Sequence, residues 1–163
     1  MAIGSAASSR ILIFSRRQKS AHHEGIRDRI VRGAQPDGLC GGVVERGRKP
    51  ALTAVAGKPV ATNSAATFAD GMAVRIPHAD AFQIIKHGAD RIVTVSDDEI
   101  AEAMRSYYRC CHTLSEGAGA APLAALMTER AKMQGKRVGV ILSGGNIDMS
   151  KFAEVLNGGT PRP

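Results

Sequence analysis

The sequence has no tryptophan, and aromatic residues make up only 4% of its 163 residues. Proteins that bind single-stranded nucleic acid by base stacking need exposed aromatic side chains, so this composition argues against that class. Hydrophobic residues nevertheless make up 44% of the chain, and a core has to be built from Ala, Val, Ile, Leu and Met. The length is sufficient for one domain with such a core.

The sequence also has no long apolar run and few cysteines. No run approaches the roughly 20 apolar residues that a membrane-spanning helix needs. The short run at 11–14 precedes basic residues, which is the reverse of the order in a secretory signal. The three cysteines are Cys40, Cys110 and Cys111. A disulfide framework needs an even number of cysteines, and these three do not have the spacing of a metal site. We therefore expect a cytoplasmic protein with reduced thiols and no membrane span.

The common phosphate-binding loops are absent as well. The sequence contains neither a G-x-G-x-x-G motif after a predicted strand nor a Walker motif. The net charge of +7 comes entirely from residues 1–60, which hold eleven Lys or Arg and four Asp or Glu, whereas residues 61–163 are balanced. A basic segment can bind polyanions, but without a recognition motif we expect no nucleic-acid partner.

The most informative stretch is the segment 137–149, with the sequence RVGVILSGGNIDM. Val138, Val140 and Leu142 belong to a short, almost entirely apolar run, which predicts a strand buried on both faces of a parallel sheet. The run ends at Ser143-Gly144-Gly145-Asn146. A glycine turn at the carboxyl end of a parallel strand is where open α/β sheets bind ligands. The turn therefore offers candidate site residues, although an ordinary strand-to-helix connection explains the same sequence.

The rest of the chain alternates predicted strands and helices. Residues 1–40 have no sustained periodicity, and we predict a basic, weakly ordered leader there, followed by a domain at 41–163. The elements predicted from periodicity and from start and stop signals are strands at 41–45 and 91–95 and helices at 24–31, 51–56, 78–87, 97–111, 123–133 and 149–156. This alternation predicts an α/β fold, a partial three-layer sheet with mainly parallel strands.

Acidic residues stand where two helices are predicted to begin. Ser96, with Glu99 three positions later, has the pattern of a capping box, and Asp97 and Asp98 add charge to the first turn. Such a cluster suits acid/base chemistry or Mg²⁺, but the helix dipole favours it without any such role. Glu116 lies at a loop-to-helix junction beside backbone N–H groups. It is a second candidate site residue, although the helix dipole also favours an acidic residue at the N-terminus of a helix without any such role.

Four blocks of sequence resemble the C-terminal part of the serine/threonine dehydratases, which are fold-type II pyridoxal-phosphate enzymes. The blocks follow one another in the order and spacing of that family, from about Val43 to near the C-terminus. They are TFADGMAVR (67–75), ADRIVTVSDDEIAEAM (89–104), SEGAGAAPLAAL (115–126) and GKRVGVILSGGNID (135–148). The resemblance implies the C-terminal part of a fold-type II enzyme, with pyridoxal 5'-phosphate as its cofactor.

The same resemblance implies roles for the candidate residues. Ser143 would hydrogen-bond the pyridine nitrogen of the cofactor, while Gly144, Gly145 and Asn146 would form the wall around the ring. Glu116 resembles the acid that the family places near the cofactor. Pyridoxal phosphate acts as an electron sink, and a neutral serine partner leaves its ring nitrogen less firmly protonated than a carboxylate would. The expected reaction is α,β-elimination of a hydroxy amino acid to a 2-oxo acid and ammonia.

Two parts of the family's site have no counterpart in the sequence. The Schiff-base lysine and the tetraglycine loop for the cofactor phosphate precede all four blocks in the family, and residues 1–40 contain neither. We therefore identify no catalytic residue. Glu45 matches an acid that often binds a cation in the family, but the cationic run 46–49 would repel a metal ion, so we predict no metal site.

Two classes of function follow from these observations. The first is a pyridoxal-phosphate-dependent threonine/serine dehydratase in truncated form, whose substrate is a small hydroxy amino acid. The second is a non-catalytic remnant or interaction module that lacks the Schiff-base lysine. The sequence does not decide between threonine and serine, and it leaves open whether the protein forms a homo-oligomer.

Overall fold

A computed structural model describes residues 9–12, 39–44, 57–61, 65–76, 79–88 and 91–163. The described strands form one sheet, in the order β3-β2-β1-β4, and each neighbouring pair is parallel. The strands are β1 (Ser9–Leu12), β2 (Leu39–Val44), β3 (Arg91–Val95) and β4 (Arg137–Val140). The predicted α/β class with a parallel sheet is confirmed.

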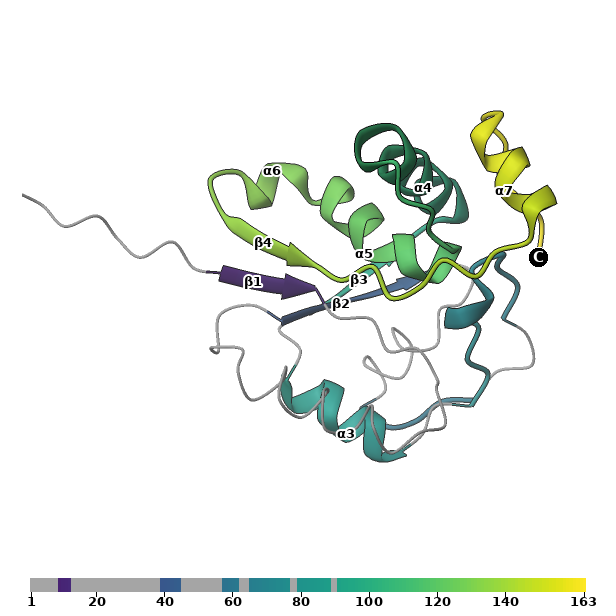
Figure 1. The fold of residues 1–163 in the computed structure, drawn as a ribbon. Helices are drawn as coiled ribbons and strands as arrows, with labels where there is room; N and C mark the ends of the chain where they lie inside the picture. The colour runs from purple at the N-terminus through teal and green to yellow at the C-terminus, as the bar shows by residue number, and fades with distance from the viewer. Residues whose placement is uncertain (1–8, 13–38, 45–56, 62–64, 77–78, 89–90) are drawn as a thin grey trace, which may run out of the picture.

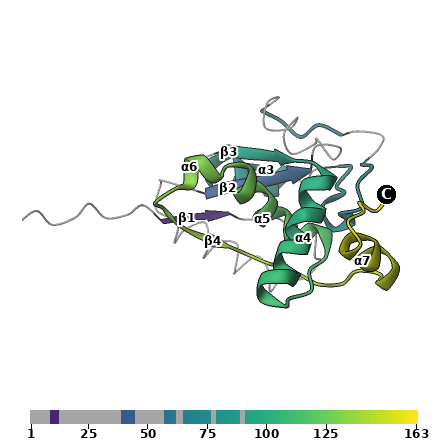
Figure 2. The ribbon, with the colours of Figure 1, turned by 90° about the horizontal axis from the view of Figure 1, so that it is seen from above.

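Helices cover both faces of this sheet (Figure 1). On one face lie α4 (Asp97–Cys111), α5 (Gly117–Thr128) and the short α6 (Arg130–Met133), and on the other lies α3 (Ala79–Gly88). α5 contacts β2 and β3 directly, and α4 packs against α5 (Figure 2). The structure therefore has the three layers that the sequence predicts.

Small residues bring α5 close to the sheet. Every residue from Gly117 to Pro122 is buried, whereas the sequence predicted a helix only at 123–133. Pro122 lies inside α5 and has no N–H to donate, which locally disfavours a helix. The prediction of the helix start was wrong because burial of this run of small residues outweighs the local preference.

The beginning of α4 is fixed by the predicted capping box. The hydroxyl of Ser96 accepts a hydrogen bond from the backbone N–H of Glu99 at 3.2 Å, and the Glu99 carboxylate accepts one from the N–H of Ser96 at 2.7 Å. Asp97 and Asp98 also accept hydrogen bonds, from the hydroxyls of Thr67 and Thr160. The acidic cluster thus caps a helix and ties it to distant segments, which favours its structural interpretation.

β4 differs from its prediction in position. It is parallel, but it ends at Val140 and lies at the edge of the described sheet, paired with β1. Val138 and Val140 are half-buried, and Gly139 and Ile141 are exposed, so the prediction of a strand buried on both faces was wrong. An apolar run indicates a parallel strand, but pairing among distant segments decides whether that strand is central or at an edge.

The strand β1 has no counterpart among the predicted elements, because four residues are too few to show a period of two. It lies within the range predicted as a leader, and the boundary at residue 40 stays a prediction. The helices predicted at 24–31 and 51–56, together with Glu45, lie outside the described residues. Across the described ranges, no helix has the length and apolar character needed to cross a membrane.

Candidate functional site

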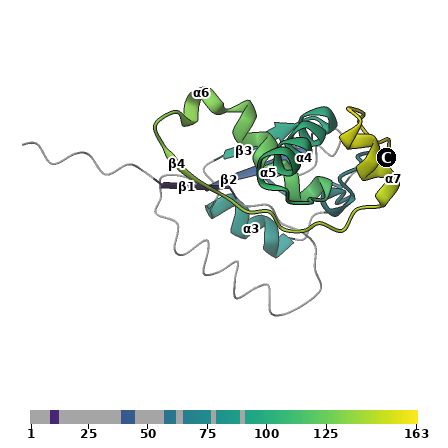
Figure 3. The same cartoon turned by 45° about the horizontal axis from the view of Figure 1, so that its top comes forward.

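The candidate site lies where the segment 141–148 leaves β4 and runs past α5 toward α7 (Met149–Leu156) (Figure 3). This segment contains Ser143–Asn146, and the prediction of a turn there was wrong, because residues 141–148 form neither helix, strand nor turn; we keep the name turn for these four residues. α7 has the predicted bounds. Gly144, four residues beyond the end of β4, meets the beginning of α5, where Glu116 is the N-cap residue.

Glu116 connects α5 to the turn. Its side chain is buried, with 4% of the residue exposed. The backbone N–H of Glu116 donates to the carbonyl of Gly144 at 3.0 Å, and the backbone N–H of Asn146 donates to Oε2 of Glu116 at 3.2 Å. One hydrogen bond accepted by the carboxylate and one donated by the backbone of Glu116 together fix the position of the turn relative to the helix.

Close backbone approach explains the glycines around this carboxylate. A Cβ atom on Gly144 would lie 2.8 Å from Oε1 of Glu116, and a Cβ atom on Gly119 of α5 would lie 2.5 Å from the carbonyl oxygen of Gly144. A Cβ atom on Gly119 would press against the backbone of Gly144, which can give way only if the turn moves, so Gly119 is needed because α5 and the turn touch through their backbones. A Cβ atom on Gly144 would instead displace the Glu116 carboxylate.

A cavity of about 460 Å³ opens beside Glu116. This volume lies within the range of small-molecule sites. Its lining combines two acids, one amide, one cation and several small or apolar residues: Asp70, Gly71, Ala73, Val74, Arg75, Ile76, Glu116 and Asn146. Most of these residues come from the short helix η1 (Asp70–Met72) and the chain that follows it.

The structure brings together some of the five predicted site residues. Glu116 and Asn146 line the cavity, and Gly144 supports it through its contact with Glu116. Ser143 and Gly145 are exposed and do not belong to the described lining. Their predicted roles beside a cofactor ring stay predictions.

The sequence analysis did not identify the η1 side of the cavity. Asp70, Gly71 and Arg75 lie in the block TFADGMAVR, which was used only as evidence of resemblance. The signal was an acid next to a glycine, with a base four residues later. A Cβ atom on Gly71 would lie 2.9 Å from Ala118, so this loop also packs closely against α5.

The described site contains neither a residue for covalent attachment of the cofactor nor a set of metal ligands. No lysine is among the described residues that line the cavity, and no group of three His, Cys, Asp or Glu in the described ranges could hold a metal ion. Cys110 and Cys111 are free and exposed at the end of α4. The described lining offers carboxylate, amide and guanidinium groups, which suit a polar small molecule.

Sequence comparison decides the family. A profile of the family described as "Pyridoxal-phosphate dependent enzyme" matches residues 29–144. The chain belongs to the pyridoxal-phosphate dependent enzyme family. The resemblance to the serine/threonine dehydratases is confirmed by similar curated proteins. An L-threo-3-hydroxyaspartate ammonia-lyase of Pseudomonas sp is 36% identical over 129 residues, and an L-threonine ammonia-lyase of Thermotoga maritima is 36% identical over 105 residues.

These relatives are much longer than this chain. The matches cover 78% of this chain and 40% of the Pseudomonas protein, and 64% of this chain and 24% of the Thermotoga protein. Among solved structures, a threonine deaminase of T.th. superposes with a TM-score of 0.75 at 25% identity, over 88% of this chain and 50% of that one. The fold-type II assignment is confirmed, and the chain spans half or less of each of these proteins.

Proposed function

We propose that the cavity beside Glu116 binds the ring of pyridoxal phosphate, and that the protein takes part in α,β-elimination from a small hydroxy amino acid. The observation that carries the proposal is the buried Glu116 carboxylate, held by the turn at the wall of a cavity of about 460 Å³. Family membership supports the cofactor. The names of the relatives, a threonine and a 3-hydroxyaspartate ammonia-lyase, support the reaction class.

The lining fits part of the cofactor. Ala73 and Val74 offer apolar surface for a ring, while Glu116 and Asn146 offer polar groups at its edge. Ser143 is exposed and lies outside the described lining, so its contact with the ring nitrogen rests on the resemblance alone. Arg75 is the cation of the described lining and suits an anionic group.

The bound cofactor supplies an electron sink for negative charge at the substrate Cα. Within the proposal, Glu116 holds the turn in place through the N–H of Asn146, and its carboxylate can accept a proton at Oε1 or Oε2. The cavity described so far has no lysine, so the covalent bond to the cofactor needs a residue from outside the described lining. This gap favours the second candidate function, a binding module without catalysis of its own.

The experiment is a titration of the full 163-residue chain with pyridoxal 5'-phosphate, followed by visible absorbance. We expect saturable binding, weakened about tenfold by Ser143→Ala, because a hydrogen bond to a charged or polarised ring nitrogen is lost. Ser150→Ala is the matched control, since Ser150 is exposed at the start of α7 and is not part of the described lining. Absence of binding contradicts the proposal, and equal weakening by both variants contradicts the role of Ser143.

Borohydride reduction separates the two candidate functions. If the cofactor remains attached after reduction and unfolding, a lysine of this chain holds it and the lyase is self-sufficient. If the cofactor binds but washes out, the chain is a binding module that needs a further polypeptide segment for catalysis. Ammonia release from L-threonine, L-serine and 3-hydroxyaspartate then identifies the substrate. The cytoplasmic location and a homo-oligomer stay predictions from the sequence.

A further inference from the structure

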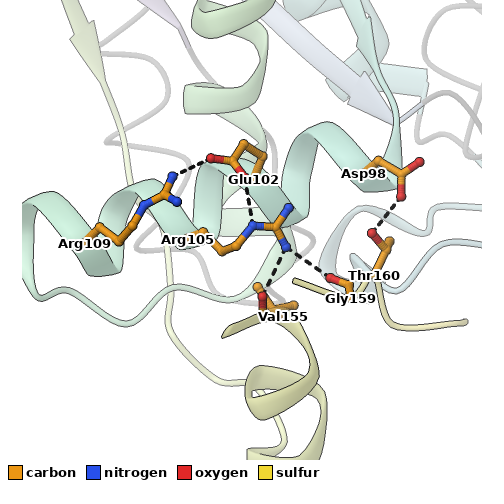
Figure 4. Close-up of polar contacts among 7 residues, drawn as sticks. All are labelled: Asp98, Glu102, Arg105, Arg109, Val155, Gly159 and Thr160. Atoms are coloured by element: carbon orange, nitrogen blue, oxygen red, sulfur yellow. Dashed lines mark hydrogen bonds and ion pairs between the residues drawn. The ribbon is translucent and has the colours of Figure 1, made fainter. Parts of the chain in front are cut away.

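A network of polar contacts joins α4 to the C-terminal end of the chain (Figure 4). Nε of Arg105 donates to Oε2 of Glu102 at 2.8 Å, and Nη1 of Arg105 donates to the carbonyls of Val155 and Gly159, each at 3.1 Å. Arg109 binds the other oxygen of Glu102. Arg105 is thus oriented by a carboxylate on its own helix and reaches across to α7.

The carbonyl of Val155 belongs to the last turn of α7, where helices leave acceptors without intrahelical donors, and Gly159 lies three residues beyond the end of the helix. Gly158 has a φ of +92° and ends the helix, which turns the carbonyl of Gly159 back toward Arg105. A cation at this helix terminus is favoured by the helix dipole as well as by the hydrogen bonds. The side chain of Arg105 is only 17% exposed, so solvent screens these contacts weakly.

α7 depends on such tertiary contacts for its position. It has eight residues, which is too short for a helix that is stable by itself in water. Phe152 and Val155 are buried, and Phe152 makes an edge contact with Tyr108 of α4, with ring centroids 5.6 Å apart. Thr160 adds a hydrogen bond of 2.6 Å to Asp98. α4 therefore holds α7 by two apolar residues and two polar anchors.

The position of α7 matters for the site because α7 follows the turn directly. Asn146 lies two residues before Asp148, the N-cap of α7, so a shift of the helix moves Asn146. The backbone N–H of Asn146 is the donor to Glu116, and the N–H of Glu116 is the donor to Gly144. These two hydrogen bonds join the turn to the beginning of α5.

We infer that Arg105 is a positioning residue for the candidate site. By holding the end of α7, it keeps the 143–148 segment against Glu116 and so preserves the polar wall of the cavity. The effect on cofactor binding rests on the proposed function, whereas the effect on the turn does not. Arg105 touches neither the cavity lining nor the five predicted site residues in any described contact.

Hydrogen exchange of the full chain tests the conformational step. Arg105→Met keeps much of the aliphatic stem and removes every donor. We expect the amides of Asn146 and Glu116 to exchange about tenfold faster, because a hydrogen bond from a charged group is lost at the anchor. Arg109→Met is the matched control, since Arg109 also binds Glu102 but is 61% exposed and makes no described contact with α7.

The outcomes separate anchoring from positioning. Faster exchange at both the turn and α7 in Arg105→Met, but not in Arg109→Met, supports the inference. Faster exchange in α7 with no change at Asn146 and Glu116 overturns it, because the helix is then anchored without positioning the site. If Arg105→Met does not fold, Arg105→Gln is measured instead, and unchanged exchange at the turn overturns the inference as well.

Pyridoxal 5'-phosphate titration gives a second readout. We expect Arg105→Met to weaken binding several-fold, to shift the absorbance maximum of the bound cofactor in the same direction as Ser143→Ala, and to be partly rescued by Arg105→Lys. A purely structural role would lower the melting temperature without moving the absorbance maximum, and that result overturns the inference. If the wild-type chain binds no cofactor, the proposed function fails, and the exchange measurement alone still tests Arg105.

Discussion

The α4–α5 layer and the 143–148 segment are held in opposite ways. Between the two helices, Ile100, Met104 and a run of alanines are fully or almost fully buried. In the segment, Ser143, Gly145 and Asn146 are exposed. Two described hydrogen bonds join it to Glu116: the N–H of Asn146 donates to the Glu116 carboxylate, and the N–H of Glu116 donates to the carbonyl of Gly144. Apolar burial thus sets the stability of the domain, while a few polar contacts set the geometry of the site.

This contrast places the candidate site in a region of lower local stability. Segments with little apolar burial and exposed backbone open more readily than packed helices, and binding sites are commonly drawn from them. The buried Glu116 connects the two regions, because it is the N-cap residue of α5 and its carboxylate binds the turn. Mutations on either side of Glu116 should therefore separate stability from site geometry.

The largest effect is expected from Met104→Ala in the packed layer. Met104 of α4 is fully buried in the core. Its truncation should therefore lower the free energy of unfolding by about 2–5 kcal/mol. Urea denaturation measures this loss. Met127→Ala is the control, since Met127 is 40% exposed. Similar losses for the two variants would mean that the α4–α5 layer is not the source of stability.

Gly119→Ala tests the contact between the two regions. The new Cβ atom would lie 2.5 Å from the carbonyl oxygen of Gly144, so the turn has to move, at a cost of about 1–3 kcal/mol. Faster exchange of the Glu116 amide, the donor to that carbonyl, reports the displacement.

Gly139→Ala in β4 is the control for this substitution, because nothing lies within 4 Å of its Cβ position. We expect it to leave both the unfolding free energy and the exchange of the Glu116 amide unchanged. If Gly119→Ala behaves like Gly139→Ala, the turn does not rest on the α5 backbone.

The smallest effect concerns pH and Glu102. The hydrogen bond from Arg105, with a further contribution from Arg109, lowers the pKa of the Glu102 carboxyl from its ordinary value of 4.5. The stabilisation is therefore fully present above pH 4.5 and is lost as the pH falls through the lowered folded-state pKa. Because the Glu102 side chain is 39% exposed, we expect less than about 1 kcal/mol.

Unfolding of the wild type and of Glu102→Gln as a function of pH measures this contribution. The difference between the two proteins should be constant from about pH 6 to pH 5 and should shrink toward about pH 3. A difference that grows on acidification would show that the sign of the pKa shift is opposite.

Local patterns in the sequence were sufficient for much of the helical layer. Ser96 and Glu99 predicted the start of α4, and the helix predicted at 97–111 has the bounds of α4. The strand at 91–95 and the helix at 149–156 have the predicted bounds. Capping and periodicity act over a few residues, so they are readable without knowledge of the fold.

The candidate site was only partly predictable, because it depends on contacts between segments that are distant in the sequence. Glu116 and Asn146 were identified, but the cavity also needs Asp70 and Arg75, which come from a segment far earlier in the chain. The contacts of Arg105 with the carbonyls of Val155 and Gly159 likewise join segments that are distant in the sequence. No local pattern encodes either pairing.

By itself, the sequence determined the α/β class, the main helices and the likeness to pyridoxal-phosphate enzymes, because these depend on hydrogen bonds, periodicity and motifs within short segments. Only the tertiary structure decided that β4 lies at the described sheet edge, that α5 begins at Gly117, and that the Gly144 backbone meets α5. Those features depend on which distant segments pack together, and that is decided by the burial of the whole core.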